Sequence, residues 1–387
     1  MKITTAEICV ACTDLPSTLR YFTDTLGFRI DMIFPADAPH TAVISAHGVR
    51  LRLVESPAAA TQPTLRFNGD QLSHLAAGLS ALDHALPDGL PIEFVDSSHD
   101  LEIPGTPVND EFVLSRFDAT ATATATAGAW NVGRAGMQYR DLIPSRLGGR
   151  FIASHIRIPD GGEVPDYVHF HKVRFQMIFC KKGWVRLVYE DQGEPFLMRA
   201  GDCVLQPPEI RHRVLEASAG LEVIEIGCPA IHETWADHEL PLPTQAINRS
   251  KKFAGQSFVH HQAADAAWRA TTSSGWVAQD TGIRVATSGL ADVRVQRAGV
   301  SSLSASGPTS GPIRSFKSAR EFHFLFVLNG AAKLTSVERG EQYLSENDCC
   351  VLPEGIDFQL SPIAGGRGAR SGTNADCEIL EVRLPGG

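Results

Sequence analysis

The residues of this chain whose types and spacing suggest chemistry are three histidines and a glutamine. His169 and His171 are separated by one residue, and residues i and i+2 of a strand point to the same face, so the two imidazoles project together. Gln176 follows near the start of the next expected strand. His212 comes after a turn with prolines at positions 207 and 208, where a further strand begins. Three imidazoles and an amide oxygen would form a site for one divalent first-row metal ion.

All four of these ligands are neutral, and this determines which kind of substrate the site would attract. The metal ion would keep its full positive charge, and an open coordination position would leave room for a substrate or for dioxygen. Such a centre favours a small anionic chelating substrate, for example an enolate, a catecholate or a carboxylate.

Two further residues are candidates for contact with that substrate. Tyr167 has the same strand parity as the two paired histidines, so its side chain is expected to line the same cavity. Arg174 has the parity of Gln176 and is the candidate for holding an anionic group, because a guanidinium can bind a carboxylate through two parallel hydrogen bonds. We therefore predict Tyr167 and Arg174 as catalytic residues. Gln206, which precedes the two prolines, is expected to border the pocket.

These residues lie in a stretch, residues 130–244, whose pattern is that of short strands separated by glycine, proline and aspartate. The whole chain of 387 residues contains 34 glycines and 23 prolines, as expected for many short strands joined by turns. The expected strands are Phe151–Pro159, Phe175–Cys180, Trp184–Glu190, Cys203–Gln206, His212–Leu215 and Leu221–Ile226.

The last part of the chain, residues 275–387, repeats this stretch at a nearly constant offset. The matched landmarks are Trp130 with Trp276, Gly136 with Gly282, Gly183 with Gly330, and Gly201 with Asn347. Landmarks kept in register indicate an internal duplication of one β-domain. At the four ligand positions the second copy has Phe316, Ser318, His323 and Phe358, so we expect no metal site there.

The two histidine segments resemble the two motifs of the cupin family. The first motif is a glycine, an H-x-H pair, a glutamate and a further glycine, and Gln176 and Gly183 stand at the last two positions. The second motif matches at Gly201, Pro207 and His212. The sequence departs from the pattern at the glutamate, where Gln176 removes a charge and a carboxylate base, and also at Glu209 and Glu216, where the family has glycine and asparagine.

This resemblance implies a mainly β fold with two tandem cupin (jelly-roll) barrels and a metal in the first barrel only. It implies a mononuclear non-haem iron(II) dioxygenase that cleaves a C–C bond of a small aromatic or enolic substrate, with manganese, nickel or zinc as alternative ions. Two other interpretations stay open. One is a non-redox lyase, isomerase or hydrolase in which Tyr167 or Glu163 moves a proton. The other is a non-catalytic protein that binds or senses a metabolite.

The first part of the chain mixes helix and strand patterns. A strand over Glu7–Cys12 precedes a helix that begins at Asp14, and strands, a second helix over residues 71–86 and a further strand follow. This α+β pattern, with the Leu26-Gly27-Phe28 segment, resembles the vicinal-oxygen-chelate family. The metal-ligand positions of that family match poorly here, with Glu7 and Arg52, so we expect an accessory domain.

Composition excludes several classes of function. The formal net charge of −9 argues against a nucleic-acid partner, which needs clustered positive charge. The sequence has no run of about 18 apolar residues, so we expect no membrane span. The first residues do not have the pattern of a signal peptide, so a cytoplasmic location is expected. An assembly of several copies is left open. The expected divisions are an accessory domain at 1–118, a linker at 119–129, a metal-binding barrel at 130–244, a connector at 245–274 and a second barrel at 275–387.

Overall fold

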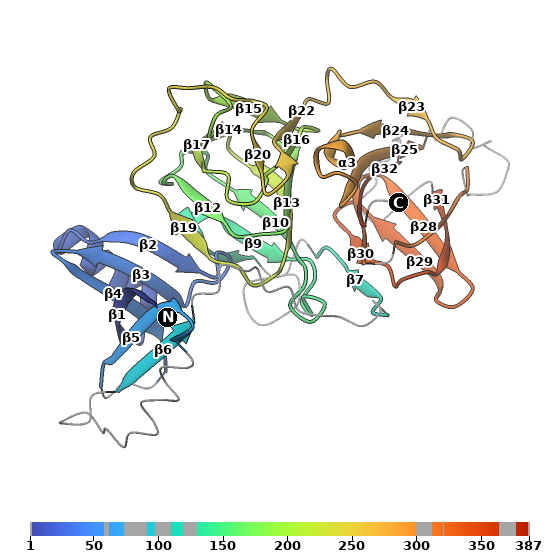
Figure 1. The fold of residues 1–387 in the computed structure, drawn as a ribbon. Coiled ribbons are helices and arrows are strands. Elements are labelled where there is room, and N and C mark those ends of the chain that lie inside the picture. Colours follow the sequence, from blue (N-terminus) through green and yellow to red (C-terminus); the bar gives the residue numbers. More distant parts are fainter. Residues whose placement is uncertain are drawn as a thin grey trace.

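Three groups of strands follow one another along the chain (Figure 1). The computed structural model describes residues 2–57, 62–72, 91–96, 110–118, 130–298, 312–319, 321–363 and 377–385. Strands dominate this part of the chain, which confirms the mainly β fold class. The linker expected at 119–129 lies outside the described residues, as does all but the start of the helix expected over 71–86. None of the described helices has the length and apolar character that a membrane span requires.

The N-terminal part is a twisted sheet with one short helix. Asp14 caps the helix by accepting a hydrogen bond from the Ser17 amide (2.9 Å), and Leu15 buries its side chain against the sheet. The strand order is β2-β3-β4-β1-β5-β6, with β1 parallel to β4 and β5 parallel to β6. The elements are β1 Lys2–Cys12, α1 Leu15–Arg20, a π-helical turn Tyr21–Thr25, β2 Arg29–Phe34, β3 Thr41–Ala46, β4 Val49–Glu55, β5 Thr64–Asp70 and β6 Ile92–Asp96.

The first barrel consists of two antiparallel sheets that face each other across an apolar interior. One contains β15-β14-β17-β12, and the other contains β16-β13-β18-β10-β9-β8. Two facing antiparallel sheets agree with the β-barrel that the sequence predicts for this stretch. The strands are β8 Asn131–Val132, β9 Gln138–Asp141, β10 Ile152–Ile158, β11 Gly162–Glu163, β12 His169–His171, β13 Phe175–Lys182, β14 Trp184–Tyr189, β15 Phe196–Arg199, β16 Cys203–Leu205, β17 His212–Ala217 and β18 Leu221–Cys228.

The second barrel repeats this plan and packs against the first. Its sheets are β24-β25-β32-β27-β30 and β26-β31-β28-β29. One buried apolar cluster contains residues of both barrels, and in it the rings of Phe151 and Phe322 stack with centroids 4.2 Å apart. The elements are β24 Trp276–Asp280, α3 Ile283–Ala286, β25 Asp292–Ala298, β26 Arg314–Lys317, β27 Phe322–Asn329, β28 Ala331–Ser336, β29 Gly340–Ser345, β30 Cys349–Val351, β31 Asp357–Pro362 and β32 Cys377–Leu384.

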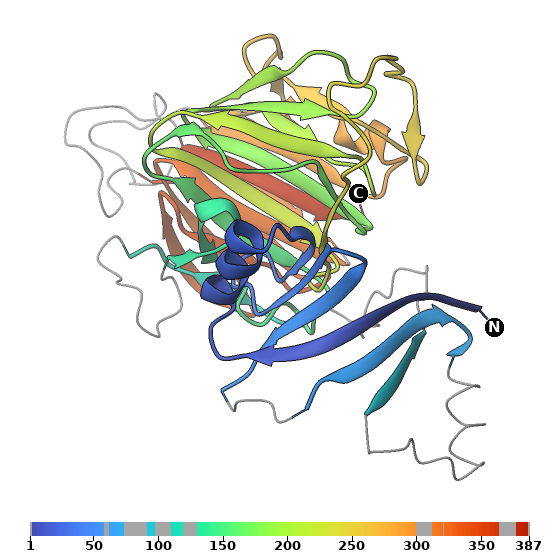
Figure 2. The same cartoon turned by 90° about the vertical axis from the view of Figure 1, so that its left-hand side faces the viewer.

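The N-terminal sheet continues directly into the first barrel. The strand β19 (Thr234–Ala236) pairs on one side with β12, where Thr234 lies opposite His171, and on the other side with β2, where it lies opposite Ile33. In Figure 2 the blue N-terminal strands lie below the barrels. The N-terminal sheet is therefore tied to the strand that carries two of the predicted ligands.

Each barrel also pairs with a short strand from a segment outside its own sequence range. The strand β7 (Val113–Ser115), which precedes the first barrel in sequence, pairs with β30 of the second barrel. The strand β22 (Val259–His261), which precedes the second barrel, pairs with β16 of the first. The sequence-based divisions placed 113–115 in the N-terminal domain and 259–261 in the connector. Strands of three residues carry too little alternation to reveal such non-local pairing.

Candidate metal site in the first barrel

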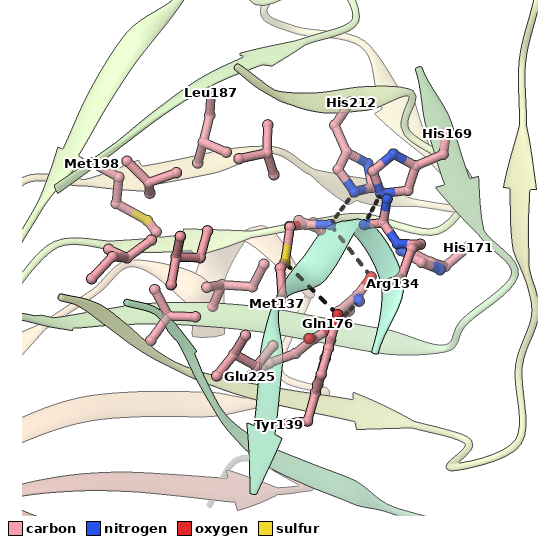
Figure 3. A pocket seen from close by; sticks show the side chains of 18 residues that line it. Arg134, Met137, Tyr139, His169, His171, Gln176, Leu187, Met198, His212 and Glu225 are labelled. Atoms are coloured by element: carbon pink, nitrogen blue, oxygen red, sulfur yellow. Dashed lines mark hydrogen bonds between the residues drawn. The ribbon is translucent and has the colours of Figure 1, made fainter. Parts of the chain in front are cut away.

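The structure brings the three predicted histidines together at one end of the first barrel (Figure 3). His169 and His171 extend from β12, and His212 begins β17, directly opposite His169 in the strand register. One candidate ligand atom from each residue lies within 4.8 Å of the others, and all three residues are buried. The expected parity of the H-x-H pair therefore holds.

The hydrogen bonds of the imidazoles place the proton of each ring on Nδ1, so the lone pair of each ring is on Nε2. The Nδ1 atom of His169 lies 2.8 Å from the carbonyl oxygen two residues before it, and that of His212 lies 3.0 Å from the equivalent oxygen. The Nδ1 atom of His171 lies 3.3 Å from the carbonyl oxygen of Glu233. A carbonyl can only accept, so each Nδ1 carries the proton and each Nε2 keeps its lone pair.

Burial keeps these imidazoles neutral, as metal ligation requires. Burial lowers the pKa of His212 to about 4, and it lowers the pKa values of His169 and His171 well below the usual value. The positive charge of nearby Arg134 contributes in the same direction at all three rings. Three neutral imidazoles with their Nε2 lone pairs free of protons fit a divalent first-row metal ion.

Gln176 faces the same cavity from β13, which belongs to the sheet opposite the histidine strands β12 and β17. Its Nε2 donates to the Glu225 carboxylate, which leaves its Oε1 directed elsewhere. The side chain of Gln206 lies between the glutamine and the triad: its Nε2 is 3.0 Å from His212 Nε2 and 3.5 Å from Gln176 Oε1. The expectation that Gln206 borders the pocket is confirmed. Gln176 is thus near the triad but linked to it through a second amide.

Arg134 lies in the site and was missed by the sequence analysis. Its Nη2 is 3.1 Å from His169 Nε2, and its Nη1 forms an ion pair with the buried carboxylate of Asp166. It comes from a short turn, Arg134–Gly136, ahead of β9, and its backbone amide donates to the carbonyl of Ala36 in the N-terminal domain (2.9 Å). No motif or periodicity marks this position, because the turn reaches the histidines only through the fold.

Arg174 does not reach the cavity, so its predicted role as an anion-binding residue there is wrong. Its guanidinium forms an ion pair with Glu321 of the second barrel, and Arg150 binds the same carboxylate at 2.9 Å. The parity argument failed because β13 begins only at Phe175. Arg174 precedes the strand, where alternation does not dictate the direction of a side chain.

Tyr167 lies beside the site, but it is not among the residues that line the cavity. Its ring is in edge contact with the ring of His169, with centroids 6.0 Å apart. Its backbone carbonyl accepts a hydrogen bond from His169 Nδ1. Its hydroxyl is buried without a hydrogen-bond partner in the described part of the chain, and burial raises its pKa to about 12. The described contacts give Tyr167 a part in orienting His169 through its backbone.

The cavity has a volume of about 80 Å³, with a polar end and a larger apolar end. In Figure 3 the histidines and Arg134 gather at one end, and Leu187 and Met198 lie toward the other. Glu225 is the acidic residue among its lining residues, and burial raises the pKa of its carboxyl. The apolar lining consists of Met137, Ile156, Ile158, Ile178, Val185, Leu187, Met198, Val214, Leu221 and Val223.

The second barrel has different chemistry at the equivalent positions. Phe316 and Phe358 are register partners there, as His169 and His212 are in the first barrel. His323 is fully buried, and its Nε2 lies 2.9 Å from Glu381, which also pairs with Arg314 at 2.8 Å. This described part of the second barrel therefore offers one histidine, already engaged by a carboxylate, at the four ligand positions.

In the N-terminal domain the candidate ligand positions are occupied by an ion-pair network. Glu7 is almost fully buried, and its two carboxylate oxygens accept from Arg50 (3.0 Å) and Arg52 (2.7 Å). Arg50 also binds Asp31 at 2.8 Å. These contacts use the groups that the vicinal-oxygen-chelate resemblance would place near a metal.

Comparison with known proteins gives only distant structural similarity. No family model matches the sequence, and no curated protein matches it. Protein YlbA from E. coli is similar with a TM-score of 0.46 and 10% identity, over 71% of this chain and 91% of that chain. Oxalate decarboxylase from Bacillus subtilis gives 0.47 and 11%, over 73% and 78%. Oxalate decarboxylase from Lactobacillus farciminis, in a formate complex, gives 0.47 and 13%, over 73% and 88%. At this distance, function has to be argued from the residues of this chain.

Proposed function

We propose that the first barrel is a mononuclear non-haem iron(II) dioxygenase that cleaves a C–C bond of a small aromatic or enolic substrate. The observation that carries this proposal is the histidine triad. Three buried, neutral imidazoles direct their Nε2 atoms into one end of an apolar cavity, with each Nδ1 proton held by a backbone carbonyl. Three neutral ligands suit a mononuclear ion that must also bind a substrate.

The ion would be held by His169, His171 and His212, with the amide oxygen of Gln176 as the fourth ligand. When bound, iron would supply the reaction with dioxygen and would polarise substrate oxygen atoms. The chain itself excludes water through the apolar wall and orients the ligands. Glu225 accepts from the Gln176 Nε2 and so makes Oε1, which accepts from Gln206 at 3.5 Å, the end of that side chain that would ligate.

A second candidate function is favoured by Glu225. This carboxyl lies in the cavity, and burial raises its pKa, so it is better suited to hold a proton than an exposed glutamate. A protein acid next to a Lewis-acidic ion is the arrangement of a non-redox lyase, isomerase or hydrolase. In that case manganese, nickel or zinc would serve as well as iron.

Oxygen uptake separates the two candidates. Protein reconstituted with iron(II) without oxygen would be mixed with single-ring catechols, 2-hydroxy acids and enolisable 1,3-diketones, and oxygen consumption and products would be followed. Consumption of about one O₂ per molecule of cleaved product supports the dioxygenase. Conversion without oxygen, and also with zinc or manganese, supports the non-redox enzyme and overturns the dioxygenase. His169→Ala should abolish either activity, and His47→Ala, at an exposed loop of the N-terminal domain, should leave it unchanged.

A further inference from the structure

The hydrogen bonds of Arg134 are unusual for a buried arginine. Its side chain is about nine-tenths buried, and its Nη1 binds Asp166. Its Nη2 points at the Nε2 of His169 (3.1 Å), the nitrogen that would bind a metal ion. Its Nε is buried without a partner among the described residues. A guanidinium has five N–H donors, so this one is under-satisfied even before a ligand is considered.

Arg134 and a metal ion must compete for the same atom. The Nε2 of a neutral imidazole has one lone pair, and His169 directs its other nitrogen to a backbone carbonyl. A metal bound at His169 Nε2 therefore removes the acceptor of Arg134 Nη2. Asp166 already accepts from Arg134 Nη1 through one oxygen and from the Val214 amide (2.9 Å) through the other.

Metal binding would thus leave two donor groups of one buried cation unpaired. A buried polar group without a partner is costly, and the cost is higher for a charged group. The Asp166 carboxylate offsets the charge of the arginine, but the ion brings two more positive charges with neutral ligands only. An anionic group placed between the ion and Arg134 would satisfy both.

We propose that metal binding releases Arg134 from His169 and converts its Nη2 and Nε groups into the binding site for the carboxylate of the substrate. This inference rests on the metal site of the proposed function and narrows its substrate class. The substrate is a monocarboxylate with a compact apolar body, because among the described lining residues one guanidinium, that of Arg134, faces a wall of aliphatic side chains. A cavity of about 80 Å³ accommodates a body of about one ring.

A second anionic group on the substrate would be disfavoured. Toward Leu187 and Met198 the lining side chains are aliphatic, so a second carboxylate there would be buried without a partner. We therefore expect benzoate to bind better than a dicarboxylate of similar size, such as phthalate. Benzyl alcohol, with the same ring and no charge, would bind weakly whether or not metal is present.

The test is isothermal titration calorimetry of the full-length protein with manganese(II) and benzoate. Benzoate should bind the manganese-loaded protein roughly 10- to 100-fold more tightly than the metal-free protein, because one charge-assisted hydrogen-bond site is created. Arg134→Gln should abolish this dependence on metal. The same variant should bind manganese several-fold more tightly than the wild type, because the competitor for His169 is gone.

Two further variants keep the result interpretable. Arg134→Gln leaves the buried Asp166 carboxylate without its cation. The double variant Arg134→Gln/Asp166→Asn therefore separates the effect of losing the arginine from the effect of an unpaired buried charge. Arg199→Gln, at an exposed arginine of β15, is the matched control and should behave as the wild type. A purely structural role of Arg134 would lower stability without raising the affinity for manganese.

The outcomes distinguish this inference from the proposed function. If the wild type binds no manganese or iron, the metal site and the proposed function fail together with the inference. If manganese binds at one per chain but benzoate binds equally with and without it, the metal site stands and the inference is overturned. Unchanged metal affinity and unchanged benzoate binding in both Arg134 variants would also overturn it.

Discussion

His169 and His212 are direct register partners across β12 and β17, and their ring centroids lie 4.2 Å apart. The same register position in the second barrel joins Phe316 and Phe358, with centroids 6.2 Å apart. The equivalent strand pairing therefore carries two imidazoles in the first barrel and two phenyl rings in the second. The duplicated fold positions side chains at this point in both copies, and residue type alone decides which copy can bind a metal.

Replacing the amide of Gln176 by a carboxylate, beside Glu225, should raise the affinity for metal. Gln176→Glu places a second carboxylate beside Glu225, and like charges in a buried site repel unless a cation lies between them. We expect the metal-free variant to be less stable and its metal affinity to rise. The double variant Gln176→Glu/Glu225→Gln should recover stability. Metal titration and urea unfolding with and without metal measure both effects, and unchanged affinity in both variants would contradict the placement of residue 176 next to the ion.

Arg174 should contribute to the contact between the barrels and not to the metal site. It shares Glu321 with Arg150, and these side chains are partly exposed, so Arg174→Ala should cost only about 1 kcal/mol of unfolding free energy. Metal affinity and benzoate binding should stay at wild-type values. Urea unfolding and calorimetry provide the two measurements. A marked loss of benzoate affinity with unchanged stability would contradict this account and show that Arg174 takes part in substrate binding.

Sequence alone could predict the part of the site that depends on local geometry. The H-x-H parity on one strand and the proline turn before His212 are short-range features, and they gave the triad. The fixed offset between the copies similarly located Phe316 and Phe358. Arg134 could not be found this way, because a turn far from the histidines in sequence brings it in, with Ala135 in a left-handed conformation (φ 53°).

The error at Arg174 and the exchanged strands have a related physical cause. Alternation holds only inside a strand, and Arg174 lies one residue outside β13. The pairing of β7 with β30 joins residues 113–115 to residues 349–351, and strands this short do not specify their partner. Long-range pairing is set by the packing of whole barrels, which periodicity does not record.

Acidification should destabilise the protein partly through His155, which lies outside the metal site. Its Nε2 lies 3.0 Å from Glu222 and its Nδ1 lies 3.3 Å from an Arg140 nitrogen, an arrangement that fits the neutral ring. Burial lowers its pKa to about 4, from an ordinary value of 6.5. The unfolded chain therefore takes up a proton as the pH falls below about 6.5, while the folded chain does so only near pH 4.

The difference between the pKa values of His155 in the folded and unfolded chain should lower the free energy of unfolding by about 2 kcal/mol between pH ~7.5 and pH ~5. His155→Gln, whose amide can donate and accept at the same place, should show a shallower loss over this range. Urea unfolding at several pH values measures the slope, and His47→Gln at an exposed site is the control. Identical slopes for the wild type and His155→Gln would contradict a neutral, buried His155.

The polar cluster of the second barrel should be structural. Glu381 is buried and engaged by Arg314 and His323, so Arg314→Met leaves a buried carboxylate with one of its partners removed. We expect a loss of about 3 kcal/mol or more of unfolding free energy. The variant should still bind one metal ion per chain, measured by elemental analysis. Loss of the metal in a folded Arg314→Met protein would show that the second barrel takes part in the metal site.

The central claim is that the triad of the first barrel binds a metal ion, and metal stoichiometry tests it most directly. Protein reconstituted with iron(II) without oxygen, then freed of unbound metal, would be analysed for metal content beside His169→Ala and His212→Ala. The account predicts about one ion per chain for the wild type and almost none for either variant, with all three proteins folded. A folded wild-type protein that retains no iron, manganese, nickel or zinc, or variants that retain as much as the wild type, would contradict it.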